Sequence, residues 1–116
     1  MTSPTQHSIA LLKKEGYTVA ITEHFNAFAR IRQDLFGFVD LLAIKTGEIL
    51  AIQTTSKANM KARIDKICDL PVTKLWFQSG GKVQVHGWKK NKLRYEVSRV
   101  EIILQSEDVY FIKDIL

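Results

Sequence analysis

The chain has 116 residues, enough for one ordinary domain and too few for two independent cores joined by a linker. Its composition, 46% hydrophobic and 25% charged, excludes extended disorder, collagen-like repeats and a disulfide scaffold, so we expect residues 1–116 to fold as a single domain. The net charge of +5 permits an anionic partner without identifying one.

The beginning of the chain predicts a helix, a strand and then a connection. Ser3 and Pro4 suit a helix cap and first turn, and the apolar positions that follow predict a helix over residues 4–15. Residues 17–22 are rich in β-branched and aromatic side chains and predict a strand. Residues 24–36 have no clean period and predict an irregular connection, a type of segment that often carries function.

Two apolar runs follow, at residues 38–44 and 49–55, separated by a break that contains Gly47. Continuous apolarity over this length predicts strands covered on both faces, and the glycine break predicts a hairpin between them. The next segment is helical by its spacing, because one stripe of apolar side chains recurs at i, i+4, i+7 and i+8. These stripe residues are Met60, Ile64, Ile67 and Cys68.

The last third of the chain predicts a further helix and two more strands. Pro71 restarts a helical turn that ends at Gly80. Residues 83–88 alternate as a strand, residues 89–92 form a turn, and residues 93–103 predict a second, bent strand. Ser106 is expected to cap a short final helix. The order of these elements places the protein in the α/β class.

Two further properties bear on the cellular setting. Cys68 is the only cysteine, which excludes an internal disulfide and a four-thiolate zinc site and favours a reducing cytoplasm. No apolar run approaches the roughly 18 residues of a membrane span, and the N-terminus lacks the pattern of a secretory signal, so we expect no membrane partner.

Two polar residues interrupt the two apolar strands, and their positions are related. If Thr46 and Gly47 form a two-residue loop, Lys45 faces Glu48 and Asp40 faces Gln53. Side chains directly opposite each other on antiparallel strands lie about 5 Å apart and point to the same face, so one cation could contact both. Because an isolated buried carboxylate is costly, Asp40 must pair, accept a proton or bind a metal.

A simpler explanation of Asp40 stays open at this point. The carboxylate could cap or ion-pair with the irregular segment through Arg30 or Arg32, while Gln53 supplies a hydrogen bond at the sheet edge.

The order Asp34-Leu35-Phe36-Gly37-Phe38-Val39-Asp40, a hairpin, and then Ala51-Ile52-Gln53-Thr54-Thr55-Ser56 resembles the core of the PD-(D/E)XK nuclease superfamily. The closest likeness is to small archaeal-type Holliday junction resolvases and related phage nucleases. Members carry an Asp in one strand and Glu-x-Lys in the next, on a restriction-endonuclease-like αβββαβ core with a central mixed sheet flanked by helices. About residues 4–88 can be laid over that core.

The resemblance implies a site that holds Mg²⁺ or Mn²⁺. It assigns Asp40 as the metal-binding Asp, Gln53 in place of the Glu and Thr55 in place of the Lys, with the backbone carbonyl of Thr54 as a further ligand. An amide oxygen also ligates hard cations, whereas a threonine hydroxyl cannot supply the missing positive charge.

Gln53 and Thr55 depart from the family pattern, so the missing acid and the missing cation must come from elsewhere in the chain. Lys57, Lys61 or Lys66 could supply the missing cation, and Lys57 would share the face of Gln53 if its strand continued that far. Glu23 and Asp34 are the candidates for a third acidic ligand.

Basic residues are concentrated beside this motif. Residues 49–100 hold eleven basic and three acidic side chains, a distribution that suits salt-sensitive, largely sequence-independent contact with DNA phosphates. The candidate DNA-binding residues are Arg30, Arg32, Lys57, Lys61, Arg63, Lys66, Lys89, Lys90 and Lys92.

The sequence therefore predicts a metal-dependent endonuclease that hydrolyses DNA phosphodiesters, with branched, Holliday junction-like DNA as a substrate that the resemblance suggests. The same resemblance implies a homodimer in the cytoplasm of a bacterial or phage-infected cell. Two other functions remain open: a catalytically degenerate DNA-binding or regulatory protein on the same fold, and a small protein-interaction domain.

Overall fold

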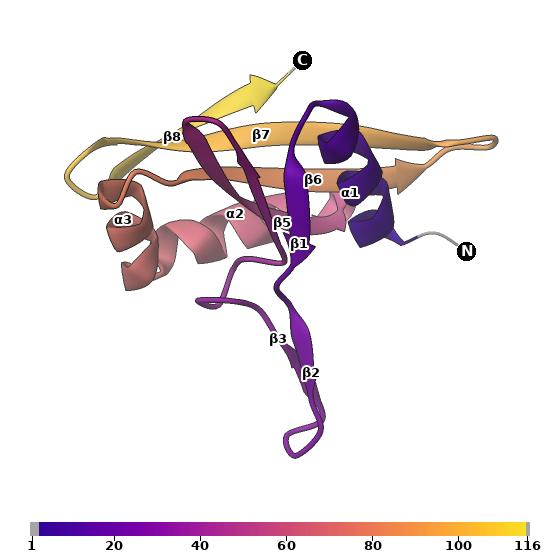
Figure 1. The fold of residues 1–116 in the computed structure, drawn as a ribbon, viewed down its shortest axis with the longest axis horizontal. Helices are drawn as coiled ribbons and strands as arrows, with labels where there is room; N and C mark the ends of the chain where they lie inside the picture. Colours follow the sequence, from indigo (N-terminus) through magenta and orange to yellow (C-terminus); the bar gives the residue numbers. More distant parts are fainter. Residues whose placement is uncertain (1–2, 116) are drawn as a thin grey trace.

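A computed structural model describes residues 3–115 as an α/β fold with three α-helices and a mixed six-stranded sheet (Figure 1). In chain order the elements of this described range are α1 (Pro4–Lys14), β1 (Thr18–Ile21), β2 (His24–Asn26), β3 (Ile31–Gln33), β4 (Leu41–Lys45), β5 (Glu48–Ser56), the 3-10 helix η1 (Lys57–Asn59), α2 (Met60–Asp69), α3 (Pro71–Gln78), β6 (Lys82–Lys90), β7 (Tyr95–Ser106) and β8 (Val109–Ile115).

The sheet has the order β1-β4-β5-β6-β7-β8. β5 and β6 are parallel, and every other neighbouring pair is antiparallel. A parallel pair needs a crossover connection, which η1, α2 and α3 provide. β2 and β3 pair only with each other, and their hairpin projects away from the rest of the domain (Figure 1).

The helices cover the sheet from both sides, so β5 is buried on both faces as its apolar sequence predicts. Ala51 packs in a core that includes Ile67 of α2, whereas Leu50 and Ile52 pack in a second core with Leu12 of α1. Side chains of a strand alternate between faces, which explains how successive residues of β5 enter different cores. By the same alternation Gln53 lies on the α2 side of the sheet.

The helical stripe predicted over Met60, Ile64, Ile67 and Cys68 is confirmed. Met60 and Ile67 are buried, and Ile64 and Cys68 pack against the same core from partly buried positions.

Two predictions about connections are wrong. Residues 24–36 are not irregular throughout, because β2 and β3 form a hairpin within them. The final segment is a strand instead of a short helix: a turn in which Asp108 has a φ of 58° leads into β8, which pairs with β7. β7 also extends well beyond the predicted end at residue 103 and offers β8 a long edge for pairing.

A buried polar network joins α1 to β6. His86 is fully buried, and its Nε2 lies 2.9 Å from Gln84 Oε1, an atom that can only accept. Nε2 therefore carries the proton, and the Ser8 hydroxyl, 2.8 Å from Nδ1, donates to it. Ser8 Oγ in turn accepts a hydrogen bond of 2.9 Å from Trp88 Nε1. Desolvation, followed by the charge of Arg99, lowers the pKa of His86 to about 3.

Within residues 3–115, none of the helices combines the length and the apolar character that crossing a membrane would require.

Candidate metal and nucleic-acid site

The register of the β4–β5 hairpin is the one predicted from sequence. Lys45 pairs with Glu48, and Leu41 pairs with Ile52, as the predicted hairpin requires. Gly47 has a φ of 78°, a conformation that glycine adopts without steric cost, and this permits the tight turn. Asp40 precedes β4, and its N–H donates at 3.0 Å to the carbonyl of Ile52, the residue that Leu41 faces, so the regular pairing ends at Leu41 and Asp40 meets Gln53 through its side chain.

Asp40 and Gln53 are in direct contact. Gln53 Nε2 donates to Asp40 Oδ2 over 2.6 Å, and the same oxygen accepts from the Thr54 N–H at 2.8 Å. The Thr54 hydroxyl lies 3.4 Å from this oxygen and 3.1 Å from the hydroxyl of Thr5 in α1. Asp40 is 3% exposed and Gln53 is 2% exposed, so this contact is removed from solvent.

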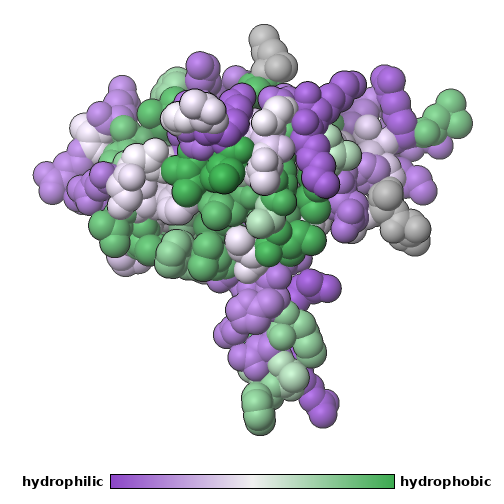
Figure 2. Space-filling view, viewed as in Figure 1, coloured by the Kyte–Doolittle hydropathy of each residue, from purple (hydrophilic) through white to green (hydrophobic). Residues whose placement is uncertain are grey.

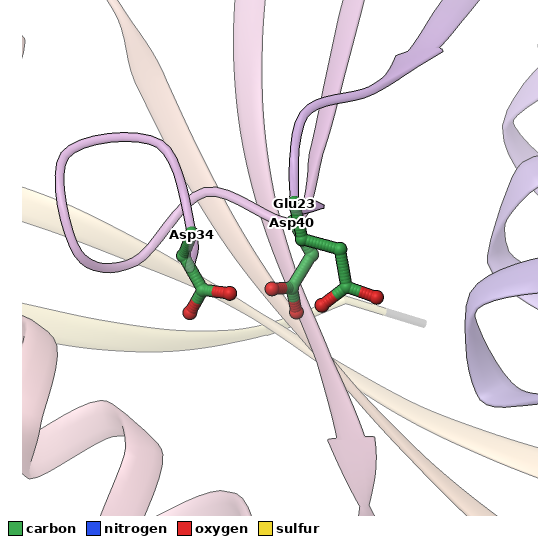
Figure 3. A group of neighbouring side chains, drawn as sticks. All are labelled: Glu23, Asp34 and Asp40. Carbon is green, nitrogen blue, oxygen red and sulfur yellow. The ribbon is translucent and has the colours of Figure 1, made fainter. Parts of the chain in front are cut away.

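Two further carboxylates converge on Asp40. One oxygen from each of Glu23, Asp34 and Asp40 lies within 4.8 Å of the others. Figure 3 shows Asp40 between the other two side chains, with all three carboxylates pointing to the same side of the ribbon. The structure thus brings both candidate third acids to the site.

Backbone contacts hold these two acids in place. The N–H groups of Thr22 and Glu23 donate to Asp40 O at 2.8 and 3.3 Å, which fixes the end of β1 beside Asp40. Asp34 begins a tight turn in which its carbonyl accepts from Gly37 N–H at 3.1 Å. Phe36 and Gly37 both have positive φ in this turn, so the chain can double back from Asp34 to Asp40 within a few residues.

The crowding of acids changes the proton affinity of Asp40. Desolvation by burial, together with the neighbouring carboxylates of Asp34 and Glu23, raises the pKa of Asp40 to about 7, against the opposing hydrogen bond from Thr54 N–H. At neutral pH this carboxyl is therefore protonated in part of the molecules, and a divalent cation would have to displace that proton in order to bind.

One atom of the site lacks a partner. Gln53 Oε1 is buried, and no group of the described residues forms a hydrogen bond with it, although such buried polar atoms are nearly always satisfied. Gln53 lines the same pocket as the three acids. The three converging carboxylates supply hard oxygen donors, the ligand type that Mg²⁺ and Mn²⁺ prefer, and Gln53 adds an unpartnered amide oxygen to the lining of the same pocket.

The pocket also has a basic wall. It has a volume of about 260 Å³ and is lined by Glu23, Arg32, Asp34, Asp40, Gln53, Thr54, Arg63 and Lys66. Arg32 Nη1 lies 3.3 Å from Glu23 Oε1, and Lys66 Nζ lies 4.0 Å from Asp34 Oδ2. Among the described residues Asp40 forms no ion pair with Arg30 or Arg32, the partners that the simpler explanation named, and Arg32 pairs with Glu23 instead.

Several predicted residues lie elsewhere. Thr55 is 8% exposed, pairs with Gly87 of β6 and is not among the lining residues of the pocket. The condition under which Lys57 would share the face of Gln53 is not met, because β5 ends at Ser56 and η1 begins at Lys57. Lys57 lines a separate groove beside Trp88.

The other basic candidates are spread over the surface. Lys89 and Lys90 lie in the groove of Lys57, and Lys92 lies in the β6–β7 turn. Lys61 forms an exposed i, i+4 ion pair with Asp65, and Arg30 lies near the tip of the β2–β3 hairpin. Of the predicted DNA contacts, the structure brings Arg32, Arg63 and Lys66 into the acidic pocket.

Sequence reasoning missed two contributors to the site. The Thr54 N–H and hydroxyl, along with Thr5, support Asp40, whereas the sequence suggested only the Thr54 carbonyl. The alternation of β5 could have revealed the Thr54 amide, but the contact with Thr5 depends on the docking of α1.

No protein-family model matches the chain, and no curated protein matches its sequence.

Proposed function

We propose that the protein is a divalent-metal-dependent endonuclease that hydrolyses DNA phosphodiesters, with Mg²⁺ or Mn²⁺ held by Asp40, Gln53 and a neighbouring acid. The observation that carries this proposal is the convergence of Glu23 and Asp34 on the Asp40–Gln53 pair, in which a buried amide oxygen has no partner among the described residues. A divalent cation would join all of these oxygens and remove the repulsion between the carboxylates.

The order of elements supports a restriction-endonuclease-like core. If the projecting hairpin is left out, the chain runs α1, β1, β4, β5, α2 and β6 before its last two strands. The helix α3 follows α2 in the chain and precedes β6. The first three of these strands are antiparallel neighbours, and the crossover from β5 returns to a parallel β6. With β2, β3, α3, β7 and β8 set aside, this order agrees with the αβββαβ core that we propose from the sequence motif.

Phosphodiester hydrolysis requires a cation that stabilises negative charge on the phosphate and groups that accept and donate protons. A bound divalent ion stabilises negative charge on a phosphate and lowers the pKa of a coordinated water. Hydrolysis joins a water oxygen to phosphorus and breaks the phosphorus bond to a sugar oxygen. The attacking water loses a proton to a carboxylate of the pocket, and the leaving sugar oxygen gains one.

Lys66 and Arg63 are the groups we assign to the phosphate oxygens. Both extend from α2 into the pocket, and Lys66 Nζ is 4.0 Å from Asp34 Oδ2. Their positive charges would stabilise the charge that grows on the non-bridging oxygens, the role that a lysine at position 55 has in the family pattern. Arg32 of β3 adds a third cation to the lining of the pocket.

Cleavage of supercoiled plasmid and of a labelled four-way junction in Mg²⁺ or Mn²⁺ tests this function. We expect nicking by the native protein, loss of nicking in EDTA, and no cleavage by Asp40→Ala. The control is Asp114→Ala, which removes an exposed acid of β8 and should cleave like the native protein. Cleavage that persists in Asp40→Ala would exclude this site.

A second function is favoured by one feature of the site. Thr55 is buried where the family pattern has its lysine, so the protein could bind metal and DNA without cutting. Salt-dependent binding that requires Asp40, with no cleavage in either metal, would favour this non-catalytic alternative.

A further inference from the structure

The β2–β3 hairpin grows directly out of the acidic pocket. Glu23 precedes β2 and Asp34 follows β3, so the two ends of the hairpin are two of the three converging acids. The ion pair between Arg32 and Glu23, at 3.3 Å, ties the hairpin to the pocket wall. The rest of the hairpin stands clear of the domain (Figure 1).

The end of this hairpin carries apolar side chains that the fold does not bury. Phe28 in the turn is fully exposed at 102%, and Phe25 and Ile31 on the strands are 59% and 50% exposed. The turn is nevertheless ordered by side-chain contacts: Asn26 Oδ1 accepts hydrogen bonds from the N–H groups of Phe28 and Ala29 at 3.0 and 3.1 Å. An ordered turn that presents an aromatic ring to solvent is a preformed contact point.

The positive charge of the hairpin favours a negatively charged partner. Residues 24–33 contain Arg30 and Arg32 and no acidic side chain. Phe25 lies directly opposite Arg32, so an aromatic ring and a guanidinium share one face of the hairpin. Figure 2 shows hydrophobic and hydrophilic residues side by side on this projection. Nucleic acid offers the matching chemistry, because it presents flat apolar bases next to phosphates.

We propose that the hairpin is a wedge for DNA, with Phe28 stacking on a base that is unpaired or unstacked next to the phosphate held at the acidic pocket. This inference rests on the proposed function and narrows its substrate to DNA with a discontinuity. Phe28 lies five positions after Glu23, which corresponds to roughly 15 Å of extended chain. The grooves of B-DNA are only about 8 Å deep, so the ring can reach the base stack from a bound phosphate.

The test compares the affinity for two DNA duplexes, one fully paired and one with a single bulged base, by fluorescence anisotropy in Ca²⁺. The variants are Phe28→Ala, Phe28→Trp and the control Phe111→Ala, which removes an exposed aromatic ring from β8. Because Phe28 is fully exposed, its substitution should leave the fold intact, and a melting curve of each variant verifies this.

We expect the native protein to prefer the bulged duplex and Phe28→Ala to lose about tenfold in affinity for it, while its affinity for the paired duplex changes by less than about twofold. Phe28→Trp should keep the preference, since it keeps a stacking surface, and Phe111→Ala should match the native protein.

Three outcomes would overturn the wedge. If the native protein cleaves DNA and Phe28→Ala retains the full preference for the bulge, the wedge is wrong and the proposed function stands. If the native protein shows neither DNA binding nor metal-dependent cleavage, both fall together. If Phe28→Ala converts a dimer to a monomer in sedimentation while the preference for the bulge persists, the tip is an interface between copies of this chain.

Discussion

Gln53 donates through Nε2 to Asp40 Oδ2 across the β4–β5 hairpin, while its own Oε1 is buried without a partner among the described residues. One end of the amide therefore donates to the central acid of the pocket, and the other end is a buried oxygen without a hydrogen-bond partner among the described residues. A substitution at Gln53 changes both ends of this amide, so it is a sensitive test for a bound metal.

Gln53→Glu should have opposite effects without and with a divalent ion. Without metal, the variant loses a donor and puts a second carboxylate next to Asp40, so we expect it to lower the free energy of unfolding by roughly 2 kcal/mol. With Mn²⁺, the added charge should tighten binding about tenfold. Urea denaturation in EDTA and calorimetric titration of Mn²⁺ measure the two effects. Gln105→Glu, an exposed change in β7, is the control, and an unchanged Mn²⁺ affinity in Gln53→Glu would contradict the site.

Asp40→Asn should stabilise the metal-free protein at high pH. The unfolded chain ionises Asp40 near its ordinary pKa of 3.8, whereas the folded chain holds the proton up to about 7. Stability contributed by this group therefore falls as pH rises from about 4 to 7, by up to about 1.4 kcal/mol per pH unit. Asparagine removes this penalty and keeps an oxygen that can accept from Gln53 and Thr54.

The measurement for Asp40→Asn is the difference in unfolding free energy from the native protein, determined in EDTA between pH 4 and 8. Between pH 4 and 8 the difference should shift by roughly 4 kcal/mol in favour of the variant. Adding Mn²⁺ should stabilise only the native protein. A pH-independent difference would show that folding does not raise the pKa of Asp40.

Lys66→Ala and Lys61→Ala form a matched pair on α2. Lys66 lines the acidic pocket, whereas Lys61 pairs with Asp65 in an exposed position. If Lys66 stabilises the charge on the phosphate, Lys66→Ala should slow cleavage about a hundredfold and Lys61→Ala should leave it nearly unchanged. Single-turnover cleavage of a labelled duplex at saturating protein separates this effect from weaker binding. Equal losses of cleavage rate in the two variants would indicate that both lysines act only through general electrostatic attraction of the DNA.

His86 should make the fold sensitive to acid. Its ordinary pKa of 6.5 applies in the unfolded chain, while burial lowers the pKa in the folded protein to about 3. Protons therefore favour the unfolded state between these values, and stability from this residue is lost as pH falls below 6.5, by about 1.4 kcal/mol per pH unit. His86→Gln removes the titration, so the stability advantage of the native protein over this variant should shrink as pH falls from 6.5 to 4.5. An advantage that stays constant would contradict a buried neutral histidine.

Ser8→Ala tests the same network without changing a titrating group. Removing the hydroxyl leaves His86 Nδ1 and Trp88 Nε1 without their shared partner in a buried region. We expect a loss of roughly 2 kcal/mol in unfolding free energy at pH 7. Ser79→Ala, which removes an exposed hydroxyl at the end of α3, is the control in the same urea experiment.

The register of the β4–β5 hairpin could be predicted from sequence because it is a local property. A short loop with Gly47 sets which residues face each other, and the alternation of side chains along a strand sets which face of the sheet each one occupies. The opposition of Asp40 and Gln53 followed from these two rules alone. The helix over residues 60–69 was equally accessible, since its apolar spacing is a helical signature.

The segments that were predicted wrongly depend on pairing between distant parts of the chain or on a hairpin with no core. β8 is a strand because the long β7 offers it an edge, a partner that its own sequence does not reveal. β2 and β3 are short and pair only with each other, so they show no buried face from which a periodic pattern could arise.

By itself, the sequence determined an α/β chain with a hairpin that sets Asp40 against Gln53, because loop length and strand alternation act over a few residues. Only the tertiary structure decided which other groups join them: Glu23 and Asp34 as the further acids, and Lys66 with Arg63 as cations in place of Lys57. These choices depend on where the loop after β3 doubles back and on how α2 packs across the sheet. Both are set by contacts between residues far apart in the chain, which the spacing of residue types does not encode.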